Sequence, residues 1–209
     1  TLRGGLGHDV LIASSGNDTL DGGEGEDDMT GGAGNDIYIV DNLGDAVIET
    51  STGGTDTIRT TLERYTLGAW IEGLVYTGTA SGTGFGNTLA NSMAGGIGND
   101  TLNAGWGSDA LNGGAGADSM VGGMGNDVYY VDNALDVVVE AADAGTDLLR
   151  VTTHATLGAN VENMAMLSTG AYRGTGNGLD NVMTGNAGKN TLSGMAGDDT
   201  LNGAAGADV

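Results

Sequence analysis

A nine-residue repeat constrains this chain more than any other feature. Eleven segments follow some version of Gly-Gly-x-Gly-x-Asp-x-U-x, where U is a large apolar residue, and the clearest copy is Gly4-Gly5-Leu6-Gly7-His8-Asp9-Val10-Leu11-Ile12. The glycines permit positive φ angles and predict a turn. The three residues after the aspartate are long enough only for a short strand, with U pointing inward. The repeat therefore predicts a solenoid built of turns and short strands.

The copies fall into three blocks separated by two spacers. The blocks begin at positions 4, 95 and 185. The spacers repeat as well, since Val40-Asp41-Asn42 returns as Val131-Asp132-Asn133. The sequence is thus a higher-order repeat of about 90 residues. The predicted organisation is a first block at 1–39, a spacer at 40–94, a second block at 95–130, a second spacer at 131–184 and a third block at 185–209.

Two consecutive repeats, about 18 residues, make one full coil of the predicted solenoid. Strands two repeats apart then become hydrogen-bonded neighbours in a parallel sheet, at about 4.8 Å. Strands one repeat apart lie on opposite sheets, and their U residues meet in a thin core. Each spacer is as long as about three such coils, so we expect the solenoid to continue through both. The alternative is that each spacer is an irregular loop between separate rolls.

The stacked turns predict a cation site. The aspartate at position 6 of one turn faces the aspartate of the turn two repeats later, and backbone carbonyls complete an all-oxygen cage. Such a cage suits Ca²⁺ better than zinc, copper or iron, and Mg²⁺ would demand a tighter octahedron. At least four Ca²⁺ ions are expected. The complete pairs are Asp9/Asp27, Asp18/Asp36, Asp100/Asp118 and Asp109/Asp127.

Other turns depart from the motif. In the copy that contains Asp18, Ala13-Ser14-Ser15 replaces the first Gly-Gly-x. In the third block, Asp199 and Asp208 remain candidate ligands, but Asp199 has no partner aspartate two repeats later in this chain. Asp208 faces Asn190 in place of an aspartate, which predicts a poor site. The segments 86–91 and 176–181 resemble asparagine-ladder turns that need no calcium.

Composition excludes several classes of partner. The chain carries 28 acidic and 6 basic residues, a formal net charge of −22, so no basic stripe exists for nucleic acid. A solvated acidic surface that keeps the chain soluble is the alternative explanation of this charge. Cysteine is absent, which removes disulfides and thiol chemistry. No apolar run is long enough to span a membrane.

The search for catalytic residues finds no convincing set, and we expect the chain not to be an enzyme. His8 and His154 are the only histidines, and both are expected to be surface residues. No His-Glu-x-x-His or Gly-x-Ser-x-Gly motif is present. Trp70 and Trp106 do not recur at equivalent positions, which argues against a repeated sugar site. The acidic spacer residues are expected to be solvated or extra calcium ligands, with acid–base pairs as the alternative: Glu49, Asp56, Glu72, Glu140, Asp147 and Glu162.

The nonapeptides resemble the RTX repeats of bacterial proteins exported by type I secretion. The resemblance covers nearly all of the chain, and the phrase Thr-Leu-Gly-Ala-x-Val-Glu-Asn also looks like spacers in large secreted calcium-binding proteins and mannuronan epimerases. It implies a right-handed parallel β-roll that is unfolded in the cytosol and folds on Ca²⁺ outside the cell. It further implies a secreted, extracellular or cell-surface location. It does not settle the activity of the parent protein.

Two functions follow from these observations. The first is a structural calcium-binding module of a secreted protein, in the setting of an adhesin, a surface layer or a fibre. The second is an accessory module of a polysaccharide-active enzyme, or of a toxin, protease or lipase, with polysaccharide as a partner. The chain begins at one motif and stops inside another, so it is expected to be a portion of a longer protein. End-to-end homotypic association through open strand edges is a further expectation.

Overall fold

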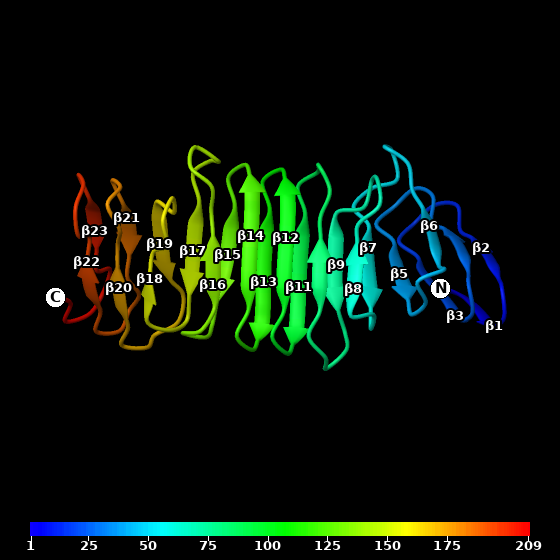
Figure 1. Ribbon diagram of the computed structural model, residues 1–209, viewed down its shortest axis with the longest axis horizontal. Helices are drawn as coiled ribbons and strands as arrows, with labels where there is room; N and C mark the ends of the chain where they lie inside the picture. The colour runs from blue at the N-terminus through cyan, green and yellow to red at the C-terminus, as the bar shows by residue number, and fades with distance from the viewer.

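The computed structural model describes residues 1–209 and consists of parallel strands stacked along one long axis (Figure 1). The amino-terminal strands lie at one end and the carboxy-terminal strands at the other. The predicted all-β parallel solenoid is therefore confirmed. No helix of a length and hydropathy that would cross a membrane is present.

One long sheet runs the length of the molecule, and every second strand of the chain belongs to it. All of its neighbours pair in parallel. Its twelve strands are β1 (Leu2–Leu6), β3 (Thr19–Glu24), β5 (Ile37–Val40), β7 (Thr57–Thr60), β9 (Gly73–Tyr76), β11 (Ser92–Ile97), β13 (Ala110–Ala115), β15 (Val128–Val131), β17 (Leu148–Val151), β19 (Asn163–Met166), β21 (Val182–Thr184) and β23 (Thr200–Asn202).

The other strands form the opposite wall, which is divided into three shorter parallel sheets. The first sheet contains β2 (Val10–Ile12), β4 (Asp28–Thr30) and β6 (Ala46–Ile48). The second contains β8 (Arg64–Thr66), β10 (Thr83–Phe85), β12 (Thr101–Trp106), β14 (Ser119–Met124) and β16 (Val137–Val139). The third contains β18 (Ala155–Thr156), β20 (Arg173–Thr175) and β22 (Thr191–Ser193).

Within a block the coil has the length that the repeat predicts. The hydrogen bond from the N–H of Asp18 to Asp36 spans 18 residues, and Leu20 pairs with Tyr38 at the same step. The pairing of β1 with β3 and of β11 with β13 follows this register as well. The blocks are therefore regular stacks of two-repeat coils.

The long sheet passes through both spacers, but the coil length changes there. Tyr38 pairs with Ile58, Ile58 with Leu74, and Leu74 with Met93. The hydrogen bonds between the matching turns span 20 residues, then 16 residues and then 19 residues. In the second spacer the middle coil is one residue shorter than in the first. The bond from the N–H of Asp147 to Glu162 spans 15 residues, whereas the equivalent bond from Asp56 to Glu72 spans 16. That single shorter coil explains why the second long repeat is one residue shorter than the first.

The core is one continuous cluster of apolar side chains between the long sheet and the three shorter sheets. The U residues of the first two blocks, such as Leu20, Met29 and Leu111, are buried as the motif predicts. A glycine, Gly84, takes the inward position in β10. A Cβ on Gly84 would lie 2.8 Å from Leu74 Cδ2 and 2.9 Å from Met93 Cε, so no larger residue fits without rearrangement.

The two long repeats differ in packing at one inward position. Tyr65 in β8 pairs with Gly84 and packs against the core, whereas Ala155 in β18 takes the equivalent place beside Gly174. The smaller side chain leaves an open pocket of about 390 Å³ whose lining includes Val131, Val138, Leu149, His154 and Ala155. The missing aromatic ring accounts for this pocket.

The substitution Ala155→Tyr should therefore stabilise the fold. The new ring would bury apolar surface in the pocket, and cavity filling of this kind commonly adds about 0.5–2 kcal/mol to the free energy of unfolding. The measurement is thermal unfolding at saturating calcium. The reverse change, Tyr65→Ala, should lower the melting temperature, and a lower melting temperature for Ala155→Tyr would contradict this account of the pocket.

Candidate metal centres along two carboxylate ladders

The turns place acidic or amide side chains in two ladders that run along the two edges of the solenoid. We call the first edge the row of turns that lead into the long sheet, and the second edge the row that leads into the opposite wall. The first edge holds, in order, Asp18, Asp36, Asp56, Glu72, Asn91, Asp109, Asp127, Asp147, Glu162, Asn181 and Asp199. The second edge holds Asp9, Asp27 and Asp45, then Asp100, Asp118 and Asp136, then Asn190 and Asp208.

Along both ladders, the backbone N–H of one rung typically donates a hydrogen bond to the side-chain oxygen of the next rung. The backbone N–H of Asp109 donates to Oδ1 of Asp127 over 2.8 Å, and the N–H of Asp100 donates to Oδ1 of Asp118 over 2.8 Å. Equivalent bonds measure 2.6–2.9 Å along the first edge. They measure 2.6–3.1 Å along the second. These bonds use only one oxygen of each carboxylate.

The second oxygen of most of these carboxylates is buried without a hydrogen-bond donor. A buried charged oxygen that lacks a partner is strongly unfavourable, so each such atom requires an explanation. No ion pair with lysine or arginine involves any of these residues. The unpartnered atoms are Oδ2 of Asp9, Asp27, Asp36, Asp56, Asp100, Asp109, Asp118, Asp127 and Asp147, together with Oε2 of Glu140.

Burial raises the pKa of several of these carboxyl groups. Burial raises the pKa of Asp109 to about 7 and the pKa of Asp56 and of Asp147 to about 6. Backbone N–H donors oppose these shifts, and neighbouring carboxylates add to them. Desolvation by burial is likewise the largest cause of the raised pKa of Asp100, Asp118 and Asp127. A divalent cation would remove that penalty by supplying the charge that the protein does not.

The atoms around the turns fit a hard cation. A Cβ on Gly95 would lie 2.5 Å from Asp100 Oδ2 and 2.5 Å from the carbonyl oxygen of Gly113. Oxygens from two adjacent turns therefore converge where the first glycine of the motif has no side chain. Carboxylate and carbonyl oxygens are the ligands that Ca²⁺ takes, in flexible geometry. The sites predicted from the repeat thus carry a donor set that suits calcium.

The four predicted pairs are each brought together in adjacent turns. Three of them lie in buried or half-buried turns with unpartnered oxygens: Asp9/Asp27, Asp100/Asp118 and Asp109/Asp127. In the fourth, Asp18 bonds to Asp36 in the same way but leaves no buried unpartnered oxygen of its own, and its Oδ1 lies 3.4 Å from the amino terminus. Asp199 and Asp208 accept N–H bonds from Asn181 and Asn190, and neither has a buried unpartnered oxygen.

Six ladder residues in the spacers were not predicted as turn ligands by the repeat. Asp45 and Asp136 continue the second edge 18 residues after Asp27 and Asp118. On the first edge, Asp56, Asp147, Glu72 and Glu162 continue the ladder at steps of 15–20 residues. The signal was present for the regular steps, since counting two repeats past the block boundary reaches both Asp45 and Asp136. The spacer acids are expected to be solvated or to be extra calcium ligands, and burial excludes the solvated state for Asp56, Asp147 and Glu140.

Asparagine rungs interrupt the acidic ladder of the first edge. Asn91 and Asn181 are buried, and their Nδ2 groups donate to the backbone carbonyls of the preceding coil. Asn87 Nδ2 donates over 2.8 Å to the carbonyls of Gly68 and Ile71. An amide supplies both donor and acceptor, so these turns satisfy their own carbonyls without a cation.

A family model for the RTX calcium-binding nonapeptide repeat matches four stretches of the chain, residues 3–38, 85–120, 107–138 and 175–209. Together they cover more than half of the sequence and include all ten aspartates at position 6 of the motif. A search of curated proteins gives no match. The family match and the carboxylate ladders thus point independently to the same ion.

The ladder predicts unequal effects for two aspartates. Asp109→Ala should shift the calcium midpoint of folding to higher concentration than Asp199→Ala does, because Asp109 is buried with an unpartnered oxygen and faces Asp127. Asp199 is only half-buried, has no buried unpartnered oxygen, and bonds to the amide residue Asn181. Calcium titrations followed by circular dichroism measure both midpoints. Equal midpoints would count against the pairing of aspartates two repeats apart.

The raised pKa values also predict a pH effect in calcium-free buffer. Folding raises the pKa of Asp56 and Asp147 from 3.8 to about 6 and that of Asp109 to about 7, so the folded form binds these protons more tightly. Their favourable contribution is present near pH 4 and is lost as the pH rises to about 7. Without calcium, the chain should show more β-structure at about pH 5 than at about pH 8 by circular dichroism. Less structure at the lower pH would show that the sign is wrong.

Proposed function

Because the chain belongs to the RTX calcium-binding nonapeptide repeat family, we propose that it is a structural calcium-binding β-roll of a secreted protein. In this proposal the chain is unfolded where calcium is scarce and folds on Ca²⁺ outside the cell. The observation that carries the proposal is the row of buried carboxylate oxygens without a donor at both edges of the solenoid. In this proposal the role of the chain is structural, and it catalyses no reaction.

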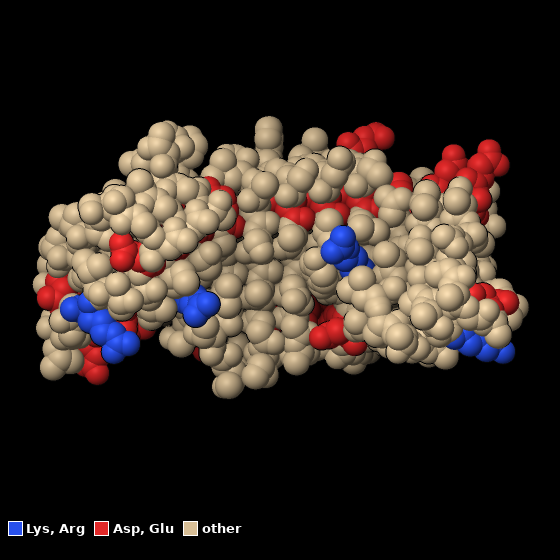
Figure 2. Space-filling view, turned by 180° about the vertical axis from the view of Figure 1, so that it is seen from behind, with Lys and Arg blue, Asp and Glu red and all other residues tan.

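Charge makes the calcium-free form unfavourable. The net charge is −22, and the ladders bring carboxylates from successive turns into contact range with no basic partner. Figure 2 shows acidic side chains distributed along the long axis and only isolated basic ones. Repulsion of this kind destabilises a compact state and favours the unfolded chain. Each bound Ca²⁺ would neutralise the carboxylates of its turn and so favour the folded chain.

The apolar core is too thin to offset this repulsion. Only 52 of the 209 residues are buried, and 14 of these are polar or charged. Ordering each residue costs about 1–2 kcal/mol of conformational entropy. A ligand that binds only the folded state adds stability as its concentration exceeds the dissociation constant. Folding would therefore be coupled to calcium concentration.

This coupling suits a protein that is exported unfolded. Extracellular calcium modules bind with dissociation constants of about 10⁻⁴–10⁻³ M, well above the range of cytosolic sensors. Sites in this range would be empty during synthesis and filled after export. The rigid rod that results would serve as a spacer or scaffold in an adhesin, surface layer or fibre. The same folding role would apply if the parent protein were a polysaccharide-active enzyme.

Circular dichroism of the chain with and without calcium tests the proposal. We expect a spectrum of unfolded chain in chelator at neutral pH and a β-sheet spectrum in millimolar Ca²⁺. Magnesium should substitute poorly, because it requires shorter bonds and near-ideal octahedral geometry. Sodium chloride at equal ionic strength separates specific binding from charge screening. A β-sheet spectrum in chelator at neutral pH would overturn the proposal.

A further inference from the structure

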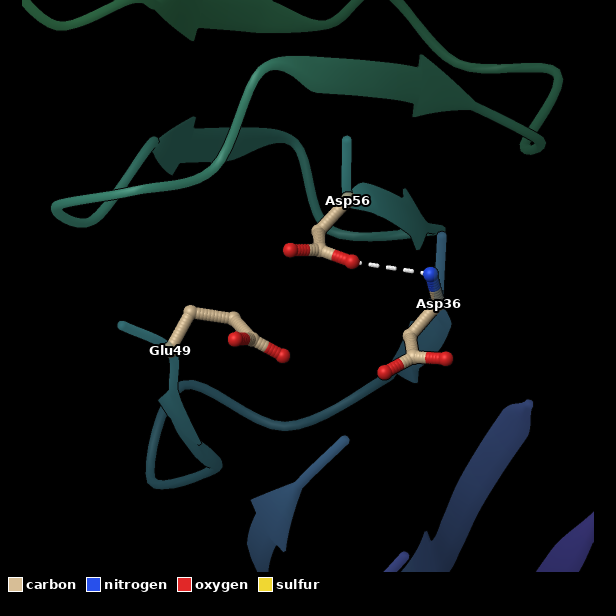
Figure 3. Close-up of side chains that lie close together, drawn as sticks. All are labelled: Asp36, Glu49 and Asp56. Atoms are coloured by element: carbon tan, nitrogen blue, oxygen red, sulfur yellow. Dashed lines mark hydrogen bonds between the residues drawn. The ribbon is translucent and has the colours of Figure 1, made fainter. Parts of the chain in front are cut away.

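Two triads of carboxylates stand where the first and second blocks pass into their spacers. They are Asp36, Glu49 and Asp56 in the first long repeat and Asp127, Glu140 and Asp147 in the second. Within each triad, one carboxylate oxygen of every member lies within 4.8 Å of the others. In Figure 3 the carboxylates of Asp36, Glu49 and Asp56 face a common space. The arrangement occurs twice, once in each long repeat.

The longer coil produces each triad. Asp36 and Asp56 are neighbouring rungs of the first edge, separated by 20 residues, a longer step than within a block. Glu49 follows β6 and opens the enlarged turn that leads to β7, so it adds a third carboxylate to the two rungs. Glu140 has the same position between β16 and β17. This third carboxylate lies outside the nonapeptide motif.

A buried tyrosine holds each glutamate in place. The hydroxyl of Tyr38 accepts a 2.7 Å hydrogen bond from the N–H of Gly31 and donates to Oε1 of Glu49. The hydroxyl of Tyr129 donates in the same way to Oε1 of Glu140. Both tyrosines are fully buried U residues. The tyrosine thus orients the glutamate from the core. It leaves Oε2 of Glu140 without a donor, whereas Oε2 of Glu49 accepts the backbone N–H of Thr50 over 3.1 Å.

Buried oxygens without donors point into both triads. They are Oδ2 of Asp36 and Asp56 in the first triad, and in the second Oδ2 of Asp127 and Asp147 with Oε2 of Glu140. The four aspartates are at most 1% exposed and Glu140 is 7% exposed. Burial raises the pKa of Glu140 to about 7. Each triad therefore concentrates negative charge in a buried place where no lysine or arginine neutralises it.

We propose that the two triads are calcium sites of a second class, each closing a nonapeptide block and each filled before the nonapeptide turns. This inference rests on the proposed function and extends it to residues outside the motif. Two oxygens bound to one Ca²⁺ at about 2.4 Å lie at most about 4.8 Å apart, and the triad oxygens all lie within that limit. The third carboxylate raises the charge of the site, and ligand charge is what tunes calcium affinity.

Removal of the third carboxylate tests the count of ions. Glu49→Gln combined with Glu140→Gln keeps the size of the side chain and one acceptor oxygen for the tyrosine hydroxyl, but removes one charge from each triad. Equilibrium dialysis against radioactive calcium should show two fewer ions than the parent chain, and the missing ions should be the tightest. The matched control is Glu24→Gln with Glu63→Gln, two exposed glutamates that form no side-chain hydrogen bond or ion pair. An unchanged number of ions and unchanged affinities in the folded double variant would overturn the inference.

A terbium titration that starts from the calcium-free chain gives a second readout, by luminescence, that does not depend on the glutamate variants. Tb³⁺ replaces Ca²⁺ at oxygen sites, and tyrosine rings close to the ion sensitise its emission. Because Tyr38 and Tyr129 contact the triads directly, emission should rise with the first ions bound and fall strongly in Tyr38→Phe/Tyr129→Phe. Tyr130→Phe/Tyr172→Phe should keep it, since neither hydroxyl bonds to a triad carboxylate. Early emission that is independent of Tyr38 and Tyr129 would refute early filling of the triads.

These outcomes separate the inference from the proposed function. A chain that binds neither calcium nor terbium would sink both. A chain that folds on calcium, with a full count of ions in the glutamate double variant, would leave the β-roll intact and remove only the triads. If the double variant fails to fold at any calcium concentration, the tyrosine variants decide the question on their own.

Discussion

The structure depends on carboxylates that are buried at many of its turns with only half of their hydrogen-bonding capacity used. One oxygen of Asp127, for example, accepts the N–H of Asp109, and this bond joins two neighbouring coils. The other oxygen has no donor. A neutral hydrogen-bonding residue would satisfy the turn without help, as Asn91 does at its own rung. The aspartates therefore leave free oxygens between stacked coils, and in the proposed function a cation fills that place.

Acidic and amide residues alternate along the first edge in a repeating order. On the first edge the sequence aspartate, aspartate, aspartate, glutamate, asparagine occurs twice in succession, beginning at Asp18 and at Asp109. The amides of the asparagine turns donate to backbone carbonyls, whereas many of the acidic turns leave a buried oxygen without a donor. Each long repeat thus combines turns that are satisfied by their own hydrogen bonds with turns that offer free oxygens to a cation.

The spacers show how a solenoid absorbs irregular sequence. One turn of the first spacer is enlarged and the coils that follow differ in length, while the inward positions stay in register because Tyr38, Ile58 and Leu74 still stack. Extra residues can be placed in a turn at little cost, since the strands and not the turns carry the sheet register. Through this freedom Glu49 reaches the first edge and joins Asp36 and Asp56.

The sequence by itself determined the repeating part of the molecule, because a turn and a three-residue strand are local structures and their period fixes which aspartates meet. Asp9 and Asp27, or Asp109 and Asp127, could be paired by counting two repeats along the chain. Only the tertiary structure decided the partners in the spacers, where coil length varies and counting fails. Whether Glu49 is solvated or meets Asp56 depends on the size of one turn and on the hydroxyl of Tyr38, and both are set by contacts between coils.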